Sequence, residues 1–204
     1  MLKTKVILIS IIFLVAGILF FTGRTEIKNT DSKGENIICF GDSLTFGYGV
    51  KPQEDYPSIL KKMVQMPVIN AGVDGDTSFD ALKRIKKDVL DNRPFLVLIE
   101  FCGNDFLKGV PEDKTVENIR EIILQVQQAK AIAVIVDISA GMFLKNYRYR
   151  LSKLAQETGA VFVPGVLSGI ITNPCMKSDF LHPNSQGYVI IAERVYRRIK
   201  PYLK

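Results

Sequence analysis

The chain alternates between short, almost wholly apolar runs and longer stretches in which apolar residues recur every three or four positions. The apolar runs are rich in branched side chains and occupy residues 36–40, 66–70, 95–100, 131–138 and 160–164. A strand that is covered on both faces has this composition, because neither face needs polar side chains. The pattern therefore predicts five buried strands.

The stretches between these runs have the spacing of amphipathic helices. In 116–130, for example, four branched residues fall on one helical face, namely Ile119, Ile122, Ile123 and Val126. Similar stretches span 57–64, 78–90, 147–159 and 185–200. Strands that alternate with helices predict a parallel sheet with right-handed crossovers, which is a three-layer α/β domain.

The beginning of the chain has a different pattern. Lys3 and Lys5 precede residues 6–22, which contain no charged side chain. This apolar run is longer than a typical signal-peptide core and shorter than a full span of about 20 residues. No small-residue cleavage site follows it, and the two lysines favour a cytoplasmic N-terminus with the following domain exported.

These features predict the organisation of the chain. We expect residues 1–23 to be a signal or membrane anchor, residues 24–35 a linker, and residues 36–204 one domain outside the cytoplasmic membrane. Anchoring is the preferred interpretation, because the cleavage site is missing. Export with a cleaved signal is the alternative.

Composition and charge exclude several classes of function. The net charge of +6 is divided equally between the first 34 residues and the rest, and no basic block with interleaved aromatics suggests nucleic-acid binding. One histidine and three cysteines without metal-ligand spacing argue against a zinc site. Cys39 and Cys102 lie in or just after predicted strands, so we expect them to pack as small apolar residues and not to form a disulfide.

The loops that follow the predicted strands carry the candidate chemistry, because functional groups gather at the carboxyl ends of parallel strands. Ser43 follows the first strand, where a serine can equally well cap a helix. His182 is the only histidine and lies in a polar turn, with Asp179 three residues earlier. A hydroxyl, an imidazole and a carboxylate that orients the imidazole are the parts that acyl transfer through serine requires.

Acyl transfer also requires donors for the negative charge that develops on the substrate oxygen. Gly72 and Asn104 follow the second and third predicted strands. Alone, each has a plain structural explanation, as a turn glycine and a loop cap. Together with the N–H of Ser43, the N–H of Gly72 and the side-chain amide of Asn104 would supply three donors.

Four sequence blocks resemble the GDSL, or SGNH, hydrolase superfamily, in particular its small bacterial lysophospholipase and arylesterase-like branch. They read FGDSLTFGYGV, VINAGVDGDTS, CGNDFLKG and DFLHPNSQGYVIIAE, in the order found in the family. The resemblance implies a flavodoxin-like sheet with strand order 2-1-3-4-5 and no metal or organic cofactor. It implies Ser43 as nucleophile, His182 as base and Asp179 as its partner. It also implies an oxyanion hole made of the Ser43 N–H, Gly72 and Asn104.

Some neighbours of these residues need separate interpretation. Many relatives have a glycine where this chain has Cys102, and we expect that cysteine to pack into the strand end and leave Asn104 in place. Asp42 and Asp105 are acids beside implied site residues, and we expect them to fix the loop backbone by hydrogen bonds.

The predicted function is a serine esterase that acts on small-molecule or lipid esters through an acyl-enzyme on Ser43. The alternatives are an esterase that removes acetyl groups from cell-envelope carbohydrates, and a membrane-tethered binding module without catalysis. Met142, Phe143 and Leu144 are three consecutive apolar residues in a loop expected at the catalytic face. They either line an acyl groove or fill the core below the loop.

Overall fold

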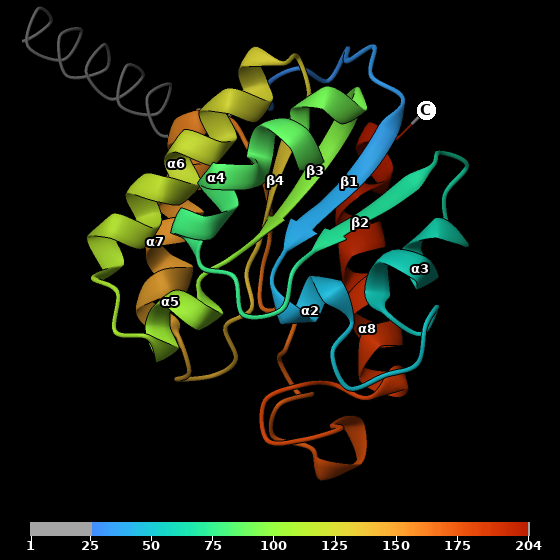
Figure 1. The fold of residues 1–204 in the computed structure, drawn as a ribbon, viewed down its shortest axis with the longest axis vertical. Coiled ribbons are helices and arrows are strands. Elements are labelled where there is room, and N and C mark those ends of the chain that lie inside the picture. Colours follow the sequence, from blue (N-terminus) through green and yellow to red (C-terminus); the bar gives the residue numbers. More distant parts are fainter. Residues whose placement is uncertain (1–25, 204) are drawn as a thin grey trace, which may run out of the picture.

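The computed structural model describes residues 26–203, which form a three-layer α/β domain around a five-stranded parallel sheet (Figure 1). The strands are β1 (Asn36–Gly41), β2 (Val68–Gly72), β3 (Pro94–Glu100), β4 (Ile132–Val136) and β5 (Val161–Val163), in the order β2-β1-β3-β4-β5. The predicted fold class and strand order are therefore confirmed.

The centre of the sheet forms the core of the domain. β1 pairs with β2 on one side and with β3 on the other, so its carboxyl end lies between two other strand ends. All seven residues of β3 are buried, and so are all five of β4. Burial on both faces explains why these strands read as continuous apolar runs.

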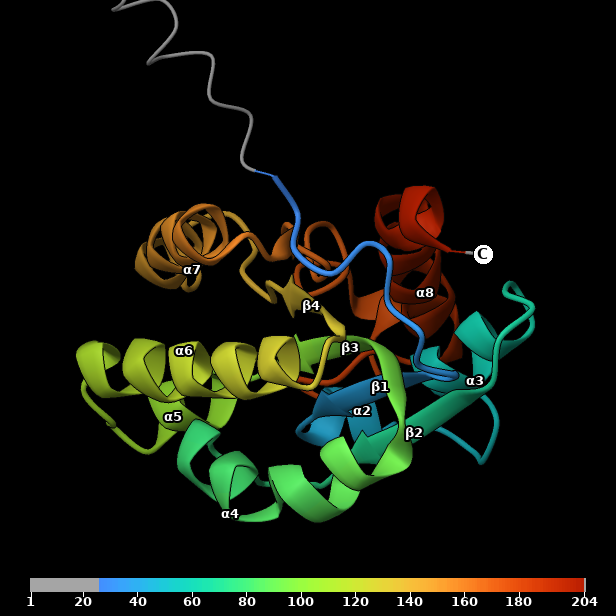
Figure 2. The same ribbon diagram turned by 90° about the horizontal axis from the view of Figure 1, so that it is seen from above.

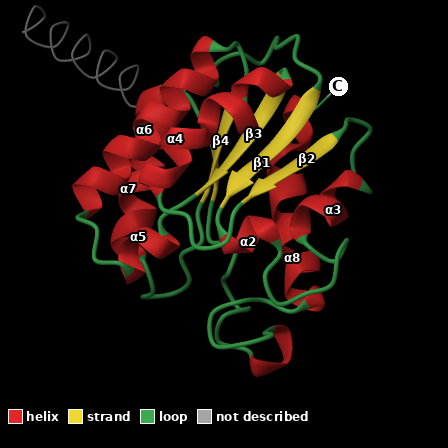
Figure 3. Cartoon of the chain, in the orientation of Figure 1, coloured by secondary structure: helices red, strands yellow, loops and turns green. Residues whose placement is uncertain are grey.

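Helices cover both faces of the sheet, as Figure 2 shows from above and Figure 3 by type of structure. α3 (Tyr56–Lys61) packs against α8 (Ser185–Ile199), and α6 (Glu112–Gln128) packs against both α4 (Ser78–Asp88) and α7 (Lys145–Thr158). Two very short helices, α2 (Ser43–Phe46) and α5 (Gly103–Leu107), lie at the carboxyl edge of the sheet. Three 3₁₀ turns complete the described chain: η1 (Leu90–Asn92), η2 (Pro174–Met176) and η3 (Lys200–Tyr202).

The predicted helices are all present, with shifted ends. α6 begins at Glu112, four residues before the predicted start, because Pro111 opens the helix and two acids occupy its first turn. α4 begins at the predicted residue, since Thr77 and Asp80 form a capping box there. The short α5 was not predicted, because five residues are too few to show a helical period.

Residues 26–35, the described part of the predicted linker, run along the amino edge of the sheet. The Lys28 N–H donates to the Gly159 carbonyl, and Asn29 donates from its side chain to the carbonyls of Gln127 and Ala131. Within residues 26–203 no helix is long and apolar enough to span a membrane. The predicted anchor, residues 6–22, lies outside the described residues.

Candidate active site

The turn after β1 presents Ser43 at the carboxyl edge of the sheet. Ser43 begins α2, and the Asp42 carboxylate caps this helix by accepting the Leu44 N–H at 3.1 Å. The serine therefore starts the helix, and its neighbour is the cap. The N–H of Ser43 has no hydrogen-bond partner among the described residues and stays available for a ligand.

Ser43, His182 and Asp179 form a hydrogen-bonded chain, although 139 residues separate the first two. His182 Nε2 lies 3.0 Å from Ser43 Oγ, and His182 Nδ1 lies 2.8 Å from Asp179 Oδ2. A carboxylate can only accept, so the imidazole proton resides on Nδ1 and leaves Nε2 free to accept from the serine hydroxyl. This is the arrangement in which histidine can act as a general base.

The turn before α8 holds the carboxylate in place. Asp179 Oδ1 accepts the N–H groups of Leu181 and His182, both at 2.7 Å. Partial burial raises the pKa of Asp179, but the hydrogen bonds from His182 and Leu181 outweigh this effect and hold the pKa below its usual value. The group facing the imidazole is therefore a carboxylate at neutral pH. The Tyr48 ring lies against the imidazole, with the two centroids 4.5 Å apart.

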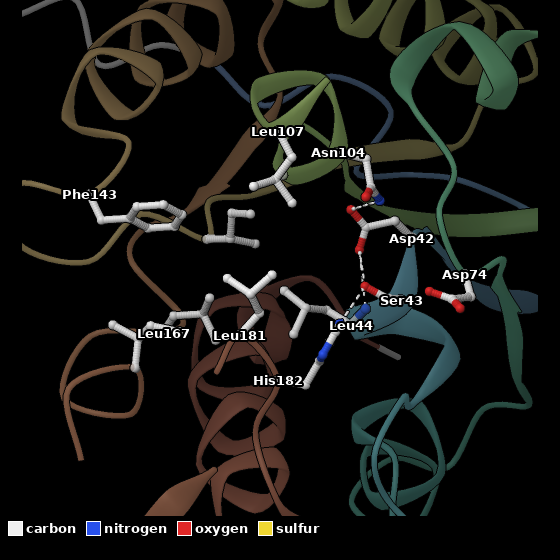
Figure 4. Close-up of a pocket in the computed structure, with 13 residues that line it drawn as sticks. Asp42, Ser43, Leu44, Asp74, Asn104, Leu107, Phe143, Leu167, Leu181 and His182 are labelled. Atoms are coloured by element: carbon white, nitrogen blue, oxygen red, sulfur yellow. Dashed lines mark hydrogen bonds between the residues drawn. The ribbon is translucent and has the colours of Figure 1, made fainter. Parts of the chain in front are cut away.

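Asn104 lies beside Ser43, at the start of α5 (Figure 4). Its side-chain nitrogen donates to Asp42 Oδ2 at 3.2 Å and to the Asp76 carbonyl at 3.0 Å. The amide is thus held at the cavity between the loops that follow β1 and β2. A bound oxyanion would compete with the Asp42 carboxylate for the same N–H group.

The structure contradicts the prediction for Gly72. Its N–H donates to Asn70 Oδ1 at 2.9 Å, and Gly72 does not line the cavity around Ser43. A side chain would not fit at Gly72, because a Cβ there would lie 2.1 Å from the backbone nitrogen of Phe46. This glycine is required for the close approach of α2 to β2.

Gly75, three residues further along, has the properties that Gly72 lacks. It lies in the turn that Asp76 closes onto the Val73 carbonyl, with φ of +80°. Its N–H has no hydrogen-bond partner among the described residues, and its neighbour Asp74 lines the cavity. The sequence Asp-Gly-Asp at 74–76 does indicate a turn at Gly75. A sequence does not show, however, which backbone N–H groups already have a hydrogen-bond partner.

Arg84 joins the loops that follow β1 and β2. Its guanidinium donates to the Gly41 carbonyl at 3.0 Å and to the Ala71 carbonyl at 2.8 Å, and its Nε bonds to Asp76 at 2.6 Å. The planar group also lies over the Phe40 ring, 4.5 Å from its centroid. Arg84 therefore fixes the spacing between the Ser43 turn and the turn that contains Gly75.

Two acids are buried at the turn that carries Ser43: Asp42 belongs to this turn, and Glu100 ends β3. Burial raises the pKa of Asp42 to about 6, although the hydrogen bond from the Leu44 N–H opposes this shift. Burial and the charge of Asp42 raise the pKa of Glu100 well above its usual value. Glu100 is therefore the member of the pair that binds a proton more readily. Its Oε2 accepts from Thr45 at 3.0 Å, so it also supports α2 from below.

As predicted, the two acids beside site residues fix the loop backbone. Asp42 accepts from Leu44 as described above, and Asp105 accepts the N–H of Ser78 at 2.9 Å and the hydroxyl of Thr115. Asp105 is fully buried and ties the start of α4 to α5 and α6. The prediction did not include Glu100, which ends an otherwise apolar run.

An apolar cavity of about 120 Å³ opens beside Ser43 and His182 (Figure 4). Asp42, Asp74 and Asn104 lie on the Ser43 side. Apart from Gly103, the rest of its wall is apolar and consists of Leu44, Leu107, Ile138, Phe143, Leu167, Ile171 and Leu181. These residues come from the loops after four of the strands and from the turn before α8. The cavity can therefore hold an apolar group next to the serine hydroxyl.

Asp137, at the end of β4, joins two of the cavity walls. This fully buried carboxylate accepts the N–H of Ser139 at 3.0 Å and the N–H of Gly165 at 2.8 Å. Arg148 also donates to it, at 3.1 Å. The loops that carry Phe143 and Leu167 are thereby held at a fixed separation.

The three consecutive apolar residues after β4 have three different environments. Phe143 lines the cavity, and its ring packs edge-on against Phe106 at 5.9 Å. Met142 does not line the cavity and is 81% exposed, while Leu144 is buried in the core. The prediction of an acyl-binding residue is therefore compatible with the structure at Phe143 only.

Cys39 and Cys102 are both buried and free, as predicted for packing residues. Cys102 has φ of 145°, a backbone conformation that favours glycine, and it stands where many members of the resembling family have glycine. Asn104 still lies at the cavity although residue 102 is a cysteine, but the backbone of Cys102 is strained.

We expect Cys102→Gly to be more stable than Cys102→Ala by about 1 kcal/mol or more, because only glycine relieves the strained φ angle. Free energies of unfolding from urea titrations would measure the difference. Ala192→Gly in α8 is the control and should show the usual order, with alanine more stable. Equal stability of the two Cys102 variants would show that the strain costs nothing.

Within residues 26–203 no group of three histidine, cysteine, aspartate or glutamate side chains could hold a metal ion. The site instead offers the hydrogen-bonded serine, histidine and carboxylate described above. Together with the fold, they define the class of protein as a serine esterase, a carboxylic ester hydrolase on a three-layer α/β scaffold.

The chain belongs to the GDSL-like Lipase/Acylhydrolase family, whose model matches residues 39–190. It is 30% identical over 204 residues to an arylesterase of Vibrio mimicus, with 93% of this chain and 98% of the relative covered. It is 29% identical over 175 residues to thioesterase 1/protease 1/lysophospholipase L1 of Escherichia coli strain K12, with 82% and 84% covered. Among solved structures, the psychrotrophic esterase EstA from Pseudoalteromonas is similar, with a TM-score of 0.75 and 26% identity. That similarity covers 82% of this chain and 98% of the other.

Proposed function

We propose that this esterase hydrolyses esters of medium or long acyl chains through an acyl-enzyme on Ser43. The observation that carries the proposal is the position of the Ser43 hydroxyl, which is bonded to His182 Nε2 and lies at the mouth of an apolar cavity. In the first step His182 takes the hydroxyl proton while Ser43 Oγ attacks the ester carbonyl carbon. His182 then gives this proton to the leaving alcohol, and water releases the acid by the reverse sequence.

Asp179 acts on the histidine and not on the substrate. Its carboxylate holds the imidazole in the tautomer with the proton on Nδ1 and stabilises the imidazolium that forms in each step. The short contact of 2.8 Å and the lowered pKa of Asp179 both support this role.

The oxyanion of the tetrahedral intermediate would lie between the N–H of Ser43, the N–H of Gly75 and the side chain of Asn104. The first two N–H groups have no hydrogen-bond partner among residues 26–203, and Asn104 is held beside them by the Asp76 carbonyl. Gly75 replaces Gly72 in this proposal, because the Gly72 N–H is already paired with Asn70.

The apolar wall of the cavity supports the choice of acyl esters. Acetyl groups would bury little of this wall, whereas each methylene of a longer chain would gain up to about 0.8 kcal/mol from burial. The names of the similar proteins include arylesterase and lysophospholipase, which is compatible with an apolar acyl group next to the serine.

We expect Phe143→Ala to lower kcat/KM for octanoate esters while sparing acetate esters, with a penalty that grows along a series of p-nitrophenyl esters. The reason is that Phe143 lines the cavity and only longer chains reach its ring. Met142→Ala is the matched control, since Met142 is the exposed neighbour and should leave the whole series unchanged. Equal losses on acetate and octanoate would place Phe143 outside the acyl site. Activity confined to acetylated sugars would contradict the acyl proposal altogether.

The location of the enzyme is a separate proposal that depends on the N-terminal sequence. Residues 6–22 would anchor it in the cytoplasmic membrane with the domain outside, as the flanking lysines favour. The described chain begins at the amino edge of the sheet, where Lys28 bonds to Gly159, and the cavity lies at the opposite edge.

Fractionation of cells that express the full chain would test the location. We expect the protein in the membrane fraction, with the domain degraded by protease added outside the cytoplasmic membrane. Full-length protein in the soluble cytoplasm would contradict both anchoring and export. A soluble exported form that starts near residue 24 would instead support the cleaved signal.

A further inference from the structure

The exposed apolar side chains of the domain are concentrated at the edge that carries the active site. Eleven large apolar side chains are exposed within residues 26–203, and eight of them lie at the carboxyl edge of the sheet or in the loops around the cavity. We call these eight the apolar rim: Phe46, Tyr48, Val73, Phe79, Phe106, Leu107, Met142 and Phe180. Scattered single exposures are normal, but eight gathered at one edge of the domain are not.

The apolar rim is continuous with the cavity. Leu107 belongs to both, since it lines the cavity and is 57% exposed. The Phe106 ring touches Phe143, which also lines the cavity. Phe180, the most exposed member at 84%, directly precedes Leu181 of the cavity wall. The rim and the apolar wall of the cavity therefore meet at Leu107 and at the Phe106–Phe143 contact.

Lysines accompany the rim on five separate segments. They are Lys51, Lys83, Lys108, Lys145 and Lys177, each within four residues of a rim side chain. Lys83 and Lys177 lie over the rings of Phe79 and Phe180, at 4.2 and 5.5 Å from the ring centroids.

The acids at this edge neutralise only part of this charge. Three are already paired: Asp80 with Lys83, Asp76 with Arg84, and Asp179 with His182. Asp74 is exposed at the cavity and Asp42 is buried beside it, and neither forms an ion pair within residues 26–203. Lys51, Lys108, Lys145 and Lys177 form no ion pair within these residues either. Positive charge therefore exceeds negative charge among the unpaired groups around the rim.

We propose that the apolar rim docks onto the surface of an anionic lipid aggregate, so that acyl chains enter the cavity directly from that surface. Apolar side chains can enter the boundary between headgroups and acyl chains, while neighbouring lysines remain at the level of the phosphates. A lipid surface suits a rim that shares Leu107 with the cavity, because a folded protein partner seated on this rim would cover the opening. The entry of an acyl chain into the cavity rests on the proposed function. Docking of the rim on the lipid surface does not.

The docking surface is independent of the N-terminal segment, since the described chain begins at the opposite edge. Binding is therefore measured on the protein that starts at residue 24. This part folds on its own: it contains one continuous core, and 82% of this chain covers 98% of the solved Pseudoalteromonas esterase.

The test is co-sedimentation of this protein with phosphatidylcholine vesicles, with and without phosphatidylglycerol. We expect binding to the mixed vesicles, and binding about tenfold or more weaker for the triple variant Phe79→Ser, Met142→Ser, Phe180→Ser. The matched control changes the three exposed apolar residues outside the rim, Leu124→Ser, Tyr149→Ser and Val189→Ser, and should bind like the parent. A second triple variant, Lys108→Gln, Lys145→Gln, Lys177→Gln, should bind more weakly to the vesicles that contain phosphatidylglycerol. Its binding to pure phosphatidylcholine vesicles should not change.

Several results would overturn the proposal. One is the absence of binding to either vesicle, and another is an equal loss in the rim variant and the control variant. Self-association that the rim variant abolishes would show that a second copy covers the rim. Hydrolysis of a soluble acetate ester, measured on every variant, separates this inference from the proposed function. The rim variant should retain that activity, and vesicle binding without any ester hydrolysis would contradict the proposed function alone.

Discussion

Replacing Ser43 with alanine is expected to lower kcat/KM for p-nitrophenyl esters by about 10⁴-fold or more, and His182→Ala should do the same. Without Ser43 Oγ no acyl-enzyme can form, and without His182 the hydroxyl loses the base whose Nε2 lies 3.0 Å from it. Because the two residues act as one unit, the double variant should be no worse than either single variant. Initial rates of p-nitrophenyl ester hydrolysis by the purified proteins would measure the loss in the two single variants and in the double variant.

The comparison needs a serine that has no part in the reaction. Ser58→Ala is suitable, since Ser58 bonds only to Asp55 at the start of α3 and should keep full activity. Circular dichroism spectra and unfolding curves should show that Ser43→Ala and His182→Ala remain folded. Near-full activity of Ser43→Ala would disprove the acyl-enzyme mechanism. Additive losses in the double variant would show that the two residues work separately.

Asn104→Ala is expected to lower kcat by about 10²- to 10³-fold with little change in KM, because an oxyanion donor acts mainly in the transition state. The structure adds a second consequence. Removing the amide also leaves Asp42 Oδ2 and the Asp76 carbonyl without their shared donor. Steady-state kinetics on acetate and octanoate esters would measure the split between kcat and KM.

Loosening of the loop alone could also slow the enzyme, and a second variant distinguishes the two causes. Asn118→Ala removes a neighbouring amide that bonds to Ser78 at 2.9 Å, so it disturbs the same corner without facing the cavity. We expect Asn118→Ala to lose stability and to retain kcat. A rise in KM at unchanged kcat for Asn104→Ala would count against the oxyanion role.

The sequence by itself was sufficient for the architecture. Runs such as residues 95–100 are apolar on both faces, and stretches such as 116–130 are apolar on one, so local pattern determines strand, helix and their alternation. The parallel sheet follows from that alternation, and the parallel sheet directs attention to the loops at its carboxyl edge. Ser43, His182 and Asp179 could be selected because each stands in such a loop or turn.

The pairing of backbone groups could not be predicted in this way. Gly72 and Gly75 lie three residues apart in the same loop, and only the structure shows that the Gly72 N–H is bonded to Asn70 while the Gly75 N–H has no partner among residues 26–203. Glycine tolerates many backbone conformations, so its presence marks a turn without saying where its N–H points.

The cavity could not be predicted from the sequence either, because its walls come from segments that are far apart in the chain. Leu167 and Ile171 come from the segment after β5 and Leu107 from α5, and they meet at Ser43 only because parallel strands end at one edge. Glu100 has an ordinary pKa in isolation, and burial beside Asp42 is what raises that pKa well above its usual value. Sequence pattern determines which residues are apolar and where strands end. Which side chains share a cavity, and which acids have a raised pKa, depends on neighbours far away in the chain that only folding brings into contact.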